Sequence, residues 1–304
     1  MNNFIFSWLK RLRQIAHNLL FFSLIGKLPY IKKALQLDIT SKCNLRCQGC
    51  YHFSGDHQPD MSDKEVLAFL EDKAKKGYKK LWVFGGEPTL RINLFDKIDE
   101  WFLEIHVISN GIIKIPQKFN WRLWISIDGP EAINDIIRGK GTYQKIIENY
   151  ANDKRVGLVM TVNSTNYQFI PAMVNLVKEI GVHSLSFTFF SRCHNQSSNE
   201  SDFSLEDLKK IEEIITNELK NNAKYLMIDA ATLKSVLYGK ISAPKWHNRC
   251  YFADVLIECY NSSGQLKKCC TENVICDTCR ILPPHQFHCL MATHKAPWWQ
   301  YVRK

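Results

Sequence analysis

After Pro29 the chain alternates regularly between two kinds of hydrophobic pattern. Short apolar runs rich in β-branched and aromatic residues predict strands at residues 35–40, 80–84, 104–109, 123–127, 156–162 and 184–189. Segments with helical periodicity predict helices at residues 63–76, 93–102, 143–150, 167–180 and 205–220. Strands that alternate with helices imply a parallel sheet, which right-handed crossovers curl into a barrel. We therefore predict an α/β fold over residues 35–225, a partial (β/α)6 TIM-like barrel with functional loops after its strands.

Residues 1–34 show a different pattern, an apolar stripe at helical spacing opposite a basic face. The stripe consists of Phe4, Trp8, Leu12, Ile15, Leu19 and Phe22. It predicts an amphipathic helix, and Ser23 interrupts the apolar stretch that a signal peptide would need. An aromatic apolar face opposite Lys10, Arg11 and Arg13 is typical of a helix on an anionic membrane surface, here through residues 1–27. The alternative is that the stripe packs on the protein's own core or on a second subunit.

The composition is that of a globular protein with an uneven charge. Of 304 residues 45% are apolar, and 40 Lys plus Arg against 30 Asp plus Glu give a net charge of +10. Six of these charges come from residues 1–37, which contain no acid, so the remaining chain is nearly balanced. We therefore expect no nucleic-acid partner, because nucleic acid is bound by a strongly basic surface. No apolar run reaches the ~18–20 residues of a membrane-spanning helix.

The 11 cysteines fall in clusters separated by long gaps, unlike those of a secreted disulfide scaffold. Clustered thiols indicate metal binding in a reducing compartment, so we expect a cytoplasmic protein. The basic leader adds the expectation that it is peripheral on the inner face of the membrane. The first cluster, Cys43, Cys47 and Cys50, has the spacing C-x3-C-x2-C and follows the first predicted strand. A structural zinc site needs four ligands, whereas three thiolates can hold three irons of a four-iron cluster and leave the fourth open.

This triplet resembles the defining motif of the radical S-adenosylmethionine (SAM) superfamily, which follows the first strand of a partial (β/α)6 barrel. After the second predicted strand, Gly85-Gly86-Glu87-Pro88 is similar to the family's GGEP segment, whose backbone binds the methionine end of SAM. The resemblance implies a [4Fe-4S] cluster on the three cysteines with SAM bound at its open iron. The reduced cluster then cleaves SAM to a 5′-deoxyadenosyl radical, which removes a hydrogen atom from the substrate.

Further polar residues occur where the family places groups that face SAM. Ser109 and Asn110 end the third strand, while Ser126 and Asp128 end the fourth. Arg138, followed by Gly139, is similar to the family's arginine-glycine pair and is a candidate partner for the SAM carboxylate, because guanidinium and carboxylate pair bidentately. The family often has an aromatic residue just before the third cysteine. This chain has Gly49 there, so Tyr51 or Phe53 becomes the candidate that packs near the adenine.

Two further expectations follow from the resemblance. The cluster needs an electron donor such as flavodoxin or ferredoxin. Cys193 lies just past the sixth predicted strand and is the candidate catalytic thiol, which would quench a substrate radical by giving up hydrogen. The alternative interpretation is an ordinary buried cysteine, because small buried cysteines are common.

A second cluster places seven cysteines within residues 250–289. The spacing Cys250-x13-Gly264-x4-Cys269 resembles the opening of the SPASM and twitch extensions, which bind auxiliary iron-sulfur clusters. Gly264 ends a turn, residues 261–264, that would bring the two cysteine-bearing strands together. We predict a cysteine-rich extension over residues 226–304 with one auxiliary [4Fe-4S] cluster, whose ligands are Cys250, Cys269, Cys276 and Cys279, with Cys270 or Cys289 as substitutes. A structural zinc on the same cysteines is the alternative, and Cys259, inside the predicted strand 255–260, is expected in the core.

Three functions remain open at this stage. The leader and the tail, residues 297–304, place Trp, Tyr and basic residues at both ends of the chain, as in interfacial anchors. The leading hypothesis is therefore a radical SAM enzyme that acts at a membrane surface on a lipid or lipid-linked molecule. The second hypothesis is a maturase that modifies a peptide or protein side chain. The third, from another class, is a non-catalytic zinc-binding protein.

Overall fold

The computed structural model describes residues 34–53, 58–193, 202–239, 252, 256–271, 274–275 and 279–286. The predictions for the leader, the tail, Cys250, Cys276 and Cys289 lie outside these residues. Among the described residues, no helix has the length and apolar character needed to span a bilayer.

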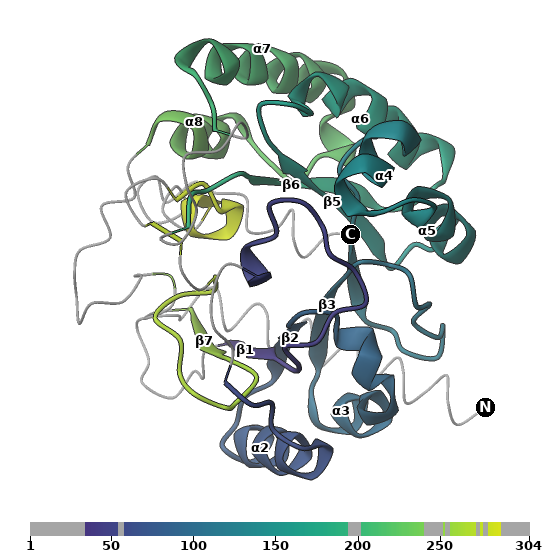
Figure 1. Ribbon diagram of the computed structural model, residues 1–304, viewed down its shortest axis with the longest axis vertical. Helices are drawn as coiled ribbons and strands as arrows, with labels where there is room; N and C mark the ends of the chain where they lie inside the picture. The colour runs from purple at the N-terminus through teal and green to yellow at the C-terminus, as the bar shows by residue number, and fades with distance from the viewer. Residues whose placement is uncertain are drawn as a thin grey trace.

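The centre of the fold is one parallel sheet of seven strands in the order β6-β5-β4-β3-β2-β1-β7 (Figure 1). The strands are β1 (Ala34–Asp38), β2 (Lys80–Phe84), β3 (Glu104–Ser109), β4 (Arg122–Ser126), β5 (Val156–Val162), β6 (Ser184–Phe189) and β7 (Ile257–Tyr260). The sheet curves but stays open, because β6 and β7 are its two edges. This confirms the predicted partial TIM-like barrel, with six strands within two residues of their predicted bounds.

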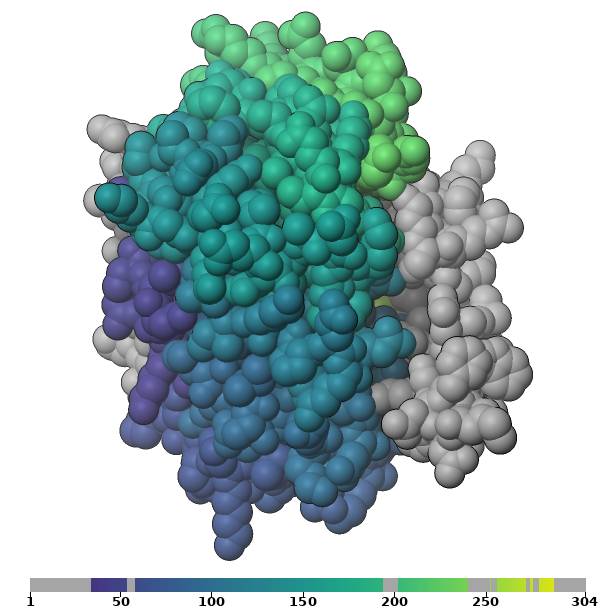
Figure 2. Space-filling view, turned by 90° about the vertical axis from the view of Figure 1, so that its right-hand side faces the viewer, coloured from purple at the N-terminus to yellow at the C-terminus, as the bar shows by residue number. Residues whose placement is uncertain are grey.

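The helices lie outside the curved sheet (Figure 1). They are α2 (Asp63–Lys75), α3 (Phe95–Trp101), α4 (Glu131–Arg138), α5 (Thr142–Tyr150), α6 (Ile170–Glu179), α7 (Leu205–Asn222) and α8 (Ala230–Tyr238). Ser62 and Ser204 begin α2 and α7 with complete capping boxes, which satisfy the first backbone N–H groups. On the face shown in Figure 2 the described residues form one surface, which runs from blue at the bottom through teal to green at the top.

The sequence pattern missed α4 and α8 and misplaced two helix starts. The two missed helices have eight and nine residues, a length similar to that of α3 and α5, which the pattern found. In α4 the only buried side chain is the polar Asn134, so no buried apolar stripe marks this helix. The predicted helix at 93–102 is instead a 3-10 segment, Pro88–Leu94, followed by α3. Similarly, the start of the predicted helix at 167–180 is the 3-10 turn Tyr167–Phe169, and α6 begins at Ile170.

One strand of the predicted C-terminal extension belongs to the barrel sheet. β7 runs parallel to β1, with Ala34 opposite Ile257 and Leu37 opposite Tyr260. The chain then reverses at the predicted turn, where Gly264 adopts a φ of +79°, and the Lys267 N–H donates to the Cys259 carbonyl at 2.7 Å. Cys259 is fully buried, as expected for a core residue.

The two faces of the strands differ in burial. Side chains that point to the helices, such as Leu123, Leu158 and Phe187, are at most 1% exposed and form the main core. Their neighbours on the inner face, such as Trp124 and Val159, remain partly exposed. In a closed (β/α)8 barrel the inner side chains fill the interior in packed layers. Here the side chains of the inner face, which lines the space that we call the lumen, are partly exposed.

We predict that adjacent residues of β5 differ sharply in their effect on stability. Leu158→Ala should lower the free energy of unfolding by about 2–5 kcal/mol, because it leaves a cavity in the packed outer layer. Val159→Ala, on the lumen face, should lower it by about 1 kcal/mol or less, because little contact is lost. Urea unfolding followed by circular dichroism measures both changes. Equal losses would contradict the distinction between a packed layer and a hollow lumen.

Candidate functional site

The predicted site residues lie in loops at the carboxyl ends of adjacent strands. The loop that we call the cysteine loop (residues 39–50) follows β1, and the GGEP loop (residues 85–88) follows β2. Residues 109–111 end β3, and residues 126–129 end β4. Because the strands are parallel, all four segments emerge at the same edge of the sheet.

Hydrogen bonds join the cysteine loop to its neighbours. The Gly86 N–H donates to the Thr40 carbonyl, and the Glu87 N–H donates to the Lys42 carbonyl, both at 2.8 Å. The Asn110 amide donates to Asn44 Oδ1 at 2.8 Å, and its Nδ2 lies 3.9 Å from Cys43 Sγ. On the far side, the Gln48 N–H donates to the Ile137 carbonyl of α4 at 2.8 Å. The structure thus brings the first cysteine cluster together with the GGEP loop and Asn110, as the sequence predicted.

The glycines of the GGEP loop allow this close approach. A Cβ atom at Gly86 would overlap the carbonyl oxygen of Lys42, next to Cys43. A Cβ at Gly85 would overlap the Thr40 carbonyl oxygen, and Gly85 also has a φ of +139°, which side chains disfavour. These overlaps are with backbone atoms, so no flexible side chain could move away to relieve them. Any other residue at these positions therefore displaces the cysteine loop.

Glu87 joins the loops after β2 and β3 through its carboxylate, which is 1% exposed. Its Oε1 accepts from the Thr89 N–H at 3.0 Å, from Thr89 Oγ1 at 2.6 Å and from Ser109 Oγ at 2.9 Å. Its Oε2 accepts from the Asn110 N–H at 2.7 Å. Burial raises the pKa of Glu87 above its usual value, while these donors act in the opposite direction. The side chain therefore positions the protein's own loops, and the buried Pro88 begins the 3-10 segment beyond it.

The three thiols are partly buried at the mouth of the barrel. Burial raises the pKa of Cys43, Cys47 and Cys50, and the positive charge of Arg138 opposes this at Cys47 and Cys50. Iron binds thiolates, so metal loading has to displace their protons. No three His, Cys, Asp or Glu side chains in the described ranges converge as ligands of a single ion would. A four-iron cluster, by contrast, takes each thiolate on a separate iron.

Arg138 and Asp128 form a buried ion pair beside the cysteine loop. Arg138 Nε lies 2.7 Å from Asp128 Oδ2, with the two side chains 11% and 5% exposed. Asp128 Oδ1 also accepts from the Thr161 N–H at 2.7 Å, and its charge helps to raise the pKa of Arg138 against the effect of burial. The expected bond from Arg138 to the SAM carboxylate stays a prediction. So does a SAM contact of Ser126, which lies partly exposed at the end of β4.

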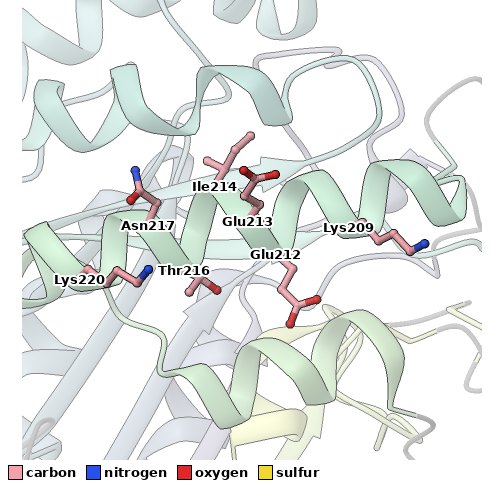
Figure 3. Close-up of a pocket in the computed structure, with 7 residues that line it drawn as sticks. All are labelled: Lys209, Glu212, Glu213, Ile214, Thr216, Asn217 and Lys220. Carbon is pink, nitrogen blue, oxygen red and sulfur yellow. The ribbon is translucent and has the colours of Figure 1, made fainter.

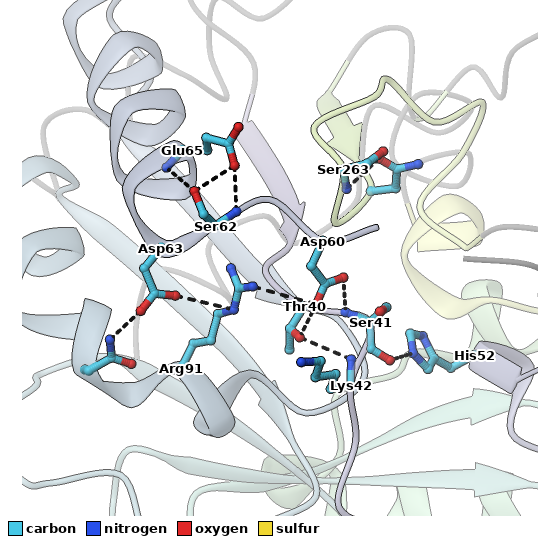
Figure 4. Close-up of polar contacts among 12 residues, drawn as sticks. Thr40, Ser41, Lys42, His52, Asp60, Ser62, Asp63, Glu65, Arg91 and Ser263 are labelled. Atoms are coloured by element: carbon cyan, nitrogen blue, oxygen red, sulfur yellow. Dashed lines mark hydrogen bonds and ion pairs between the residues drawn. The ribbon is translucent and has the colours of Figure 1, made fainter. Parts of the chain in front are cut away.

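Sequence reasoning missed the residues that hold the base of the cysteine loop (Figure 4). Asp60 accepts from Thr40 Oγ1 at 2.6 Å and from the Ser41 N–H at 2.8 Å. Burial acts to raise the pKa of Asp60, but its hydrogen bonds, including one to Ser262, keep it below the usual value. His52 Nε2 lies 2.7 Å from the Ser41 carbonyl oxygen, to which it donates. Asp60 follows a run of polar residues without regular pattern, so nothing in the sequence marks it.

The described part of the second cysteine cluster is attached to β1 and to the residues that follow β6. Near β1, Gln36 Nε2 donates to the Cys270 carbonyl at 2.8 Å, and Cys269 lies in the same partly exposed segment. Near β6, Cys193 is 1% exposed and forms a β-bridge with Val274. The Arg280 N–H, next to Cys279, donates to Ser191 Oγ at 2.8 Å. The predicted hydrogen-donor role of Cys193 stays a prediction, and the structure places this thiol beside the cysteine-rich segment.

Two further features are the exposed pair Tyr51 and Phe53 and a surface depression on α7. Tyr51 is 38% exposed in the 3-10 turn Tyr51–Phe53 that follows Cys50, and Phe53 is equally exposed under the guanidinium of Arg46. Packing of Tyr51 on adenine stays a prediction. The surface depression in Figure 3 is lined by seven residues of α7, between Lys209 and Lys220, in the outer helical layer. It contains none of the predicted site residues.

The fold and the site define an α/β barrel enzyme with a three-cysteine loop suited to an iron-sulfur cluster. Residues 37–167 match the family model of the radical SAM superfamily. This confirms the resemblance seen in the sequence. The match implies SAM and a [4Fe-4S] cluster as cofactors, and the residues present fit them: one loop supplies three thiols, and the glycines leave its neighbour room to approach.

Known proteins with similar sequences carry the names of different enzymes. The chain is 27% identical over 203 residues to the Fe-coproporphyrin III synthase of Methanosarcina barkeri, covering 60% of this chain and 51% of that protein. It is 26% identical over 226 residues to a probable GTP 3′,8-cyclase of Methanocaldococcus jannaschii, covering 67% of this chain and 76% of that one. The chain thus spans only about half of the first of these relatives.

Solved structures show the same fold. The enzyme anSMEcpe with bound AdoMet superimposes with a TM-score of 0.61 at 18% identity, covering 83% of this chain and 79% of that one. Streptococcus suis SuiB bound to its precursor peptide SuiA superimposes with a TM-score of 0.60 at 15% identity, covering 94% of this chain and 69% of that one. At these identities the likeness establishes the fold alone.

We predict that Gly86→Ala impairs the cysteine loop specifically. The added methyl group meets the Lys42 backbone, so we expect a loss of stability of about 1–3 kcal/mol and a lower iron content after anaerobic reconstitution. Gly141→Ala is the control for the steric contact, because a Cβ at Gly141 meets nothing within 4 Å, although its φ of +80° disfavours a side chain. Iron per chain is measured for both variants. A normal iron content in Gly86→Ala would show that the close approach is not required.

Proposed function

We propose that this chain is a SAM-cleaving radical enzyme that abstracts hydrogen from a substrate held in the barrel lumen. The carrying observation is the cysteine loop, which holds three thiols and is hydrogen-bonded to the GGEP loop and to Asn110. When bound, the cluster and SAM supply a 5′-deoxyadenosyl radical that takes a hydrogen atom from the substrate. The needed electron comes from a donor protein such as flavodoxin or ferredoxin.

The chain's own residues position these cofactors and shield them from water. Cys43, Cys47 and Cys50 supply the thiolates for the cluster. Glu87 fixes the GGEP loop, whose backbone would bind the methionine end of SAM. Burial raises the pKa of Cys47 and Cys50, the guanidinium of Arg138 acts to lower it, and its partner Asp128 acts to raise it. The sheet and the helices packed on its outer face close the lumen to bulk water on that side, which protects reactive intermediates.

An auxiliary [4Fe-4S] cluster on Cys269, Cys279, Cys250 and Cys276 is part of this proposal. Its support is the way in which the barrel holds the described part of the segment. Lys267, whose side chain is 2% exposed, lies 2.6 Å from the carboxylate of Asp38 at the end of β1. A buried charge pair of this kind fixes the segment in one orientation relative to the cysteine loop. A structural zinc on the same cysteines remains the alternative, and metal analysis separates the two.

A lipid or lipid-linked substrate at a membrane surface remains the proposal that the leader and tail favour. Deletion of residues 1–27 should abolish co-sedimentation with vesicles that contain anionic lipid, because it removes the basic amphipathic segment. Neutral vesicles are the control, since they lack the electrostatic attraction. Unchanged sedimentation of the deletion variant would contradict a membrane role for the leader.

A peptide or protein side chain is the second candidate substrate. The likeness to SuiB in complex with its precursor peptide favours it, since the present chain has the same fold over most of its length. A short open reading frame for a precursor peptide next to the gene would support this candidate over the lipid.

We predict that the anaerobically reconstituted and reduced protein forms 5′-deoxyadenosine from SAM. Cys47→Ala should abolish this product, because it removes one of three cluster ligands, whereas Cys259→Ala, a buried cysteine outside both ligand sets, should retain it. The triple variant of Cys43, Cys47 and Cys50 should keep about four irons per chain if the auxiliary cluster is present. Product formation by Cys47→Ala would contradict the proposed site, and zinc in place of iron would favour the non-catalytic alternative.

A further inference from the structure

The lumen contains a flat aromatic surface built from two adjacent strands. Trp124 Nε1 of β4 donates to His106 Nδ1 of β3 at 3.0 Å. The two rings are within 8° of parallel, with centroids 6.3 Å apart. A hydrogen bond between ring edges at this separation means that the rings lie side by side, nearly in one plane. We call this pair the His106–Trp124 platform.

The charged side chains of Glu104 and Lys80 hold the His106 ring of the platform in place. His106 Nε2 lies 2.7 Å from Glu104 Oε1, and Glu104 lies 3.2 Å from Lys80 Nζ. His106 therefore carries its proton on Nε2, where it donates to the carboxylate, and accepts on Nδ1. Burial lowers the pKa of His106, so the ring stays neutral. Trp82 stacks on one face of His106 at 4.0 Å between centroids.

A glycine in the middle of β5 makes room for the platform. A Cβ at Gly157 would lie 2.7 Å from Cζ3 of Trp124 and 3.1 Å from Ser184 Oγ. Glycine inside a strand weakens the strand and often marks the close approach of another group. Here it lets the indole lie across β5 towards β6. Despite this packing, Trp124 and His106 both remain partly exposed.

The platform lies on the same face of the sheet as the site, deeper in the barrel. Trp124, Ser126 and Asp128 alternate along one face of β4 and its continuation towards the cysteine loop. At about 3.3 Å per residue, Trp124 is about 13 Å below Asp128. That separation places the platform well below the loops that carry the predicted cofactor site.

We propose that the His106–Trp124 platform binds a planar ring of the substrate by stacking. This inference rests on the proposed function, since it names the part of the substrate that enters the lumen. Stacking suits a π-system because aromatic faces attract one another beyond their area of contact. Of the charged groups around His106, Lys80 is paired with Glu104, and Arg122 lies opposite His106 on β4 and acts on its pKa. Nearby strands β4 to β6 place hydroxyl side chains on the lumen face for polar ring substituents: Ser126, Thr161, Ser186 and Thr188.

Calorimetric titration of the reconstituted holoenzyme with SAM tests this inference. The probes are guanosine and N-acetyl-tryptophanamide, with N-acetyl-cyclohexylalaninamide as a saturated ring. We expect at least one planar probe to bind about tenfold more tightly than the saturated one. Trp124→Leu should weaken that binding about tenfold or more, because stacking on one aromatic side chain contributes about 1–3 kcal/mol. Trp101→Leu, on α3 in the outer layer, is the matched control and should bind as the wild type does.

Gly157→Ala provides a second variant, because it displaces the indole without removing it. Its binding of the planar probe should fall as in Trp124→Leu, with circular dichroism showing that both variants are folded. The inference is overturned if the wild type does not prefer a planar probe, or if both variants bind it unchanged. The proposed function is tested separately by 5′-deoxyadenosine formation in the same wild-type preparation. Product formation without planar-ring binding would reject this inference alone.

Discussion

The buried carboxylate of Glu87 is the interaction on which the arrangement of the site depends. It accepts four hydrogen bonds from residues after β2 and β3, and its own N–H donates to the cysteine loop after β1. Three loops are thereby fixed relative to one another at one edge of the sheet. The lack of side chains at Gly85 and Gly86 adds to this constraint, because it allows the GGEP loop to lie directly against the cysteine loop.

Stability and function use opposite faces of the same strands. The outer face packs against the helices and holds the largest buried side chains. The inner face holds aromatic, hydroxyl and paired charged groups that are incompletely covered. A partial barrel permits this separation, because an open sheet does not need its inner side chains to fill a closed interior. The inner residues are therefore available to select a substrate with limited effect on folding.

Much of the fold could be predicted because each strand and most helices carry a local pattern. The short apolar runs of β1 to β6 alternate with helical segments, and parallel order follows from that alternation. The cysteine triplet and the GGEP segment are likewise local in sequence. The pairing of β7 with β1 could not be predicted, because closure of the sheet is decided by contacts between distant segments. Asp60 and the His106–Trp124 platform could not be predicted for the same reason, because their roles depend on neighbours on other strands and loops. The Asp128–Arg138 pair shows the same limit, since the motif marks both residues but not their contact.

The contact between Asp38 and Lys267 joins residues 229 positions apart in the chain. During synthesis at ~5–20 residues per second, the strand that leads into the cysteine loop is made on the order of 10–45 s before this partner. The same delay applies to Ser262, which contacts Asp60, and to β7, which covers the edge of β1. The nascent chain therefore exposes its first three thiols before β1 gains its edge partner β7 and before Asp38 gains its charge partner Lys267. Order of synthesis thus favours loading of the first cluster onto the completed chain.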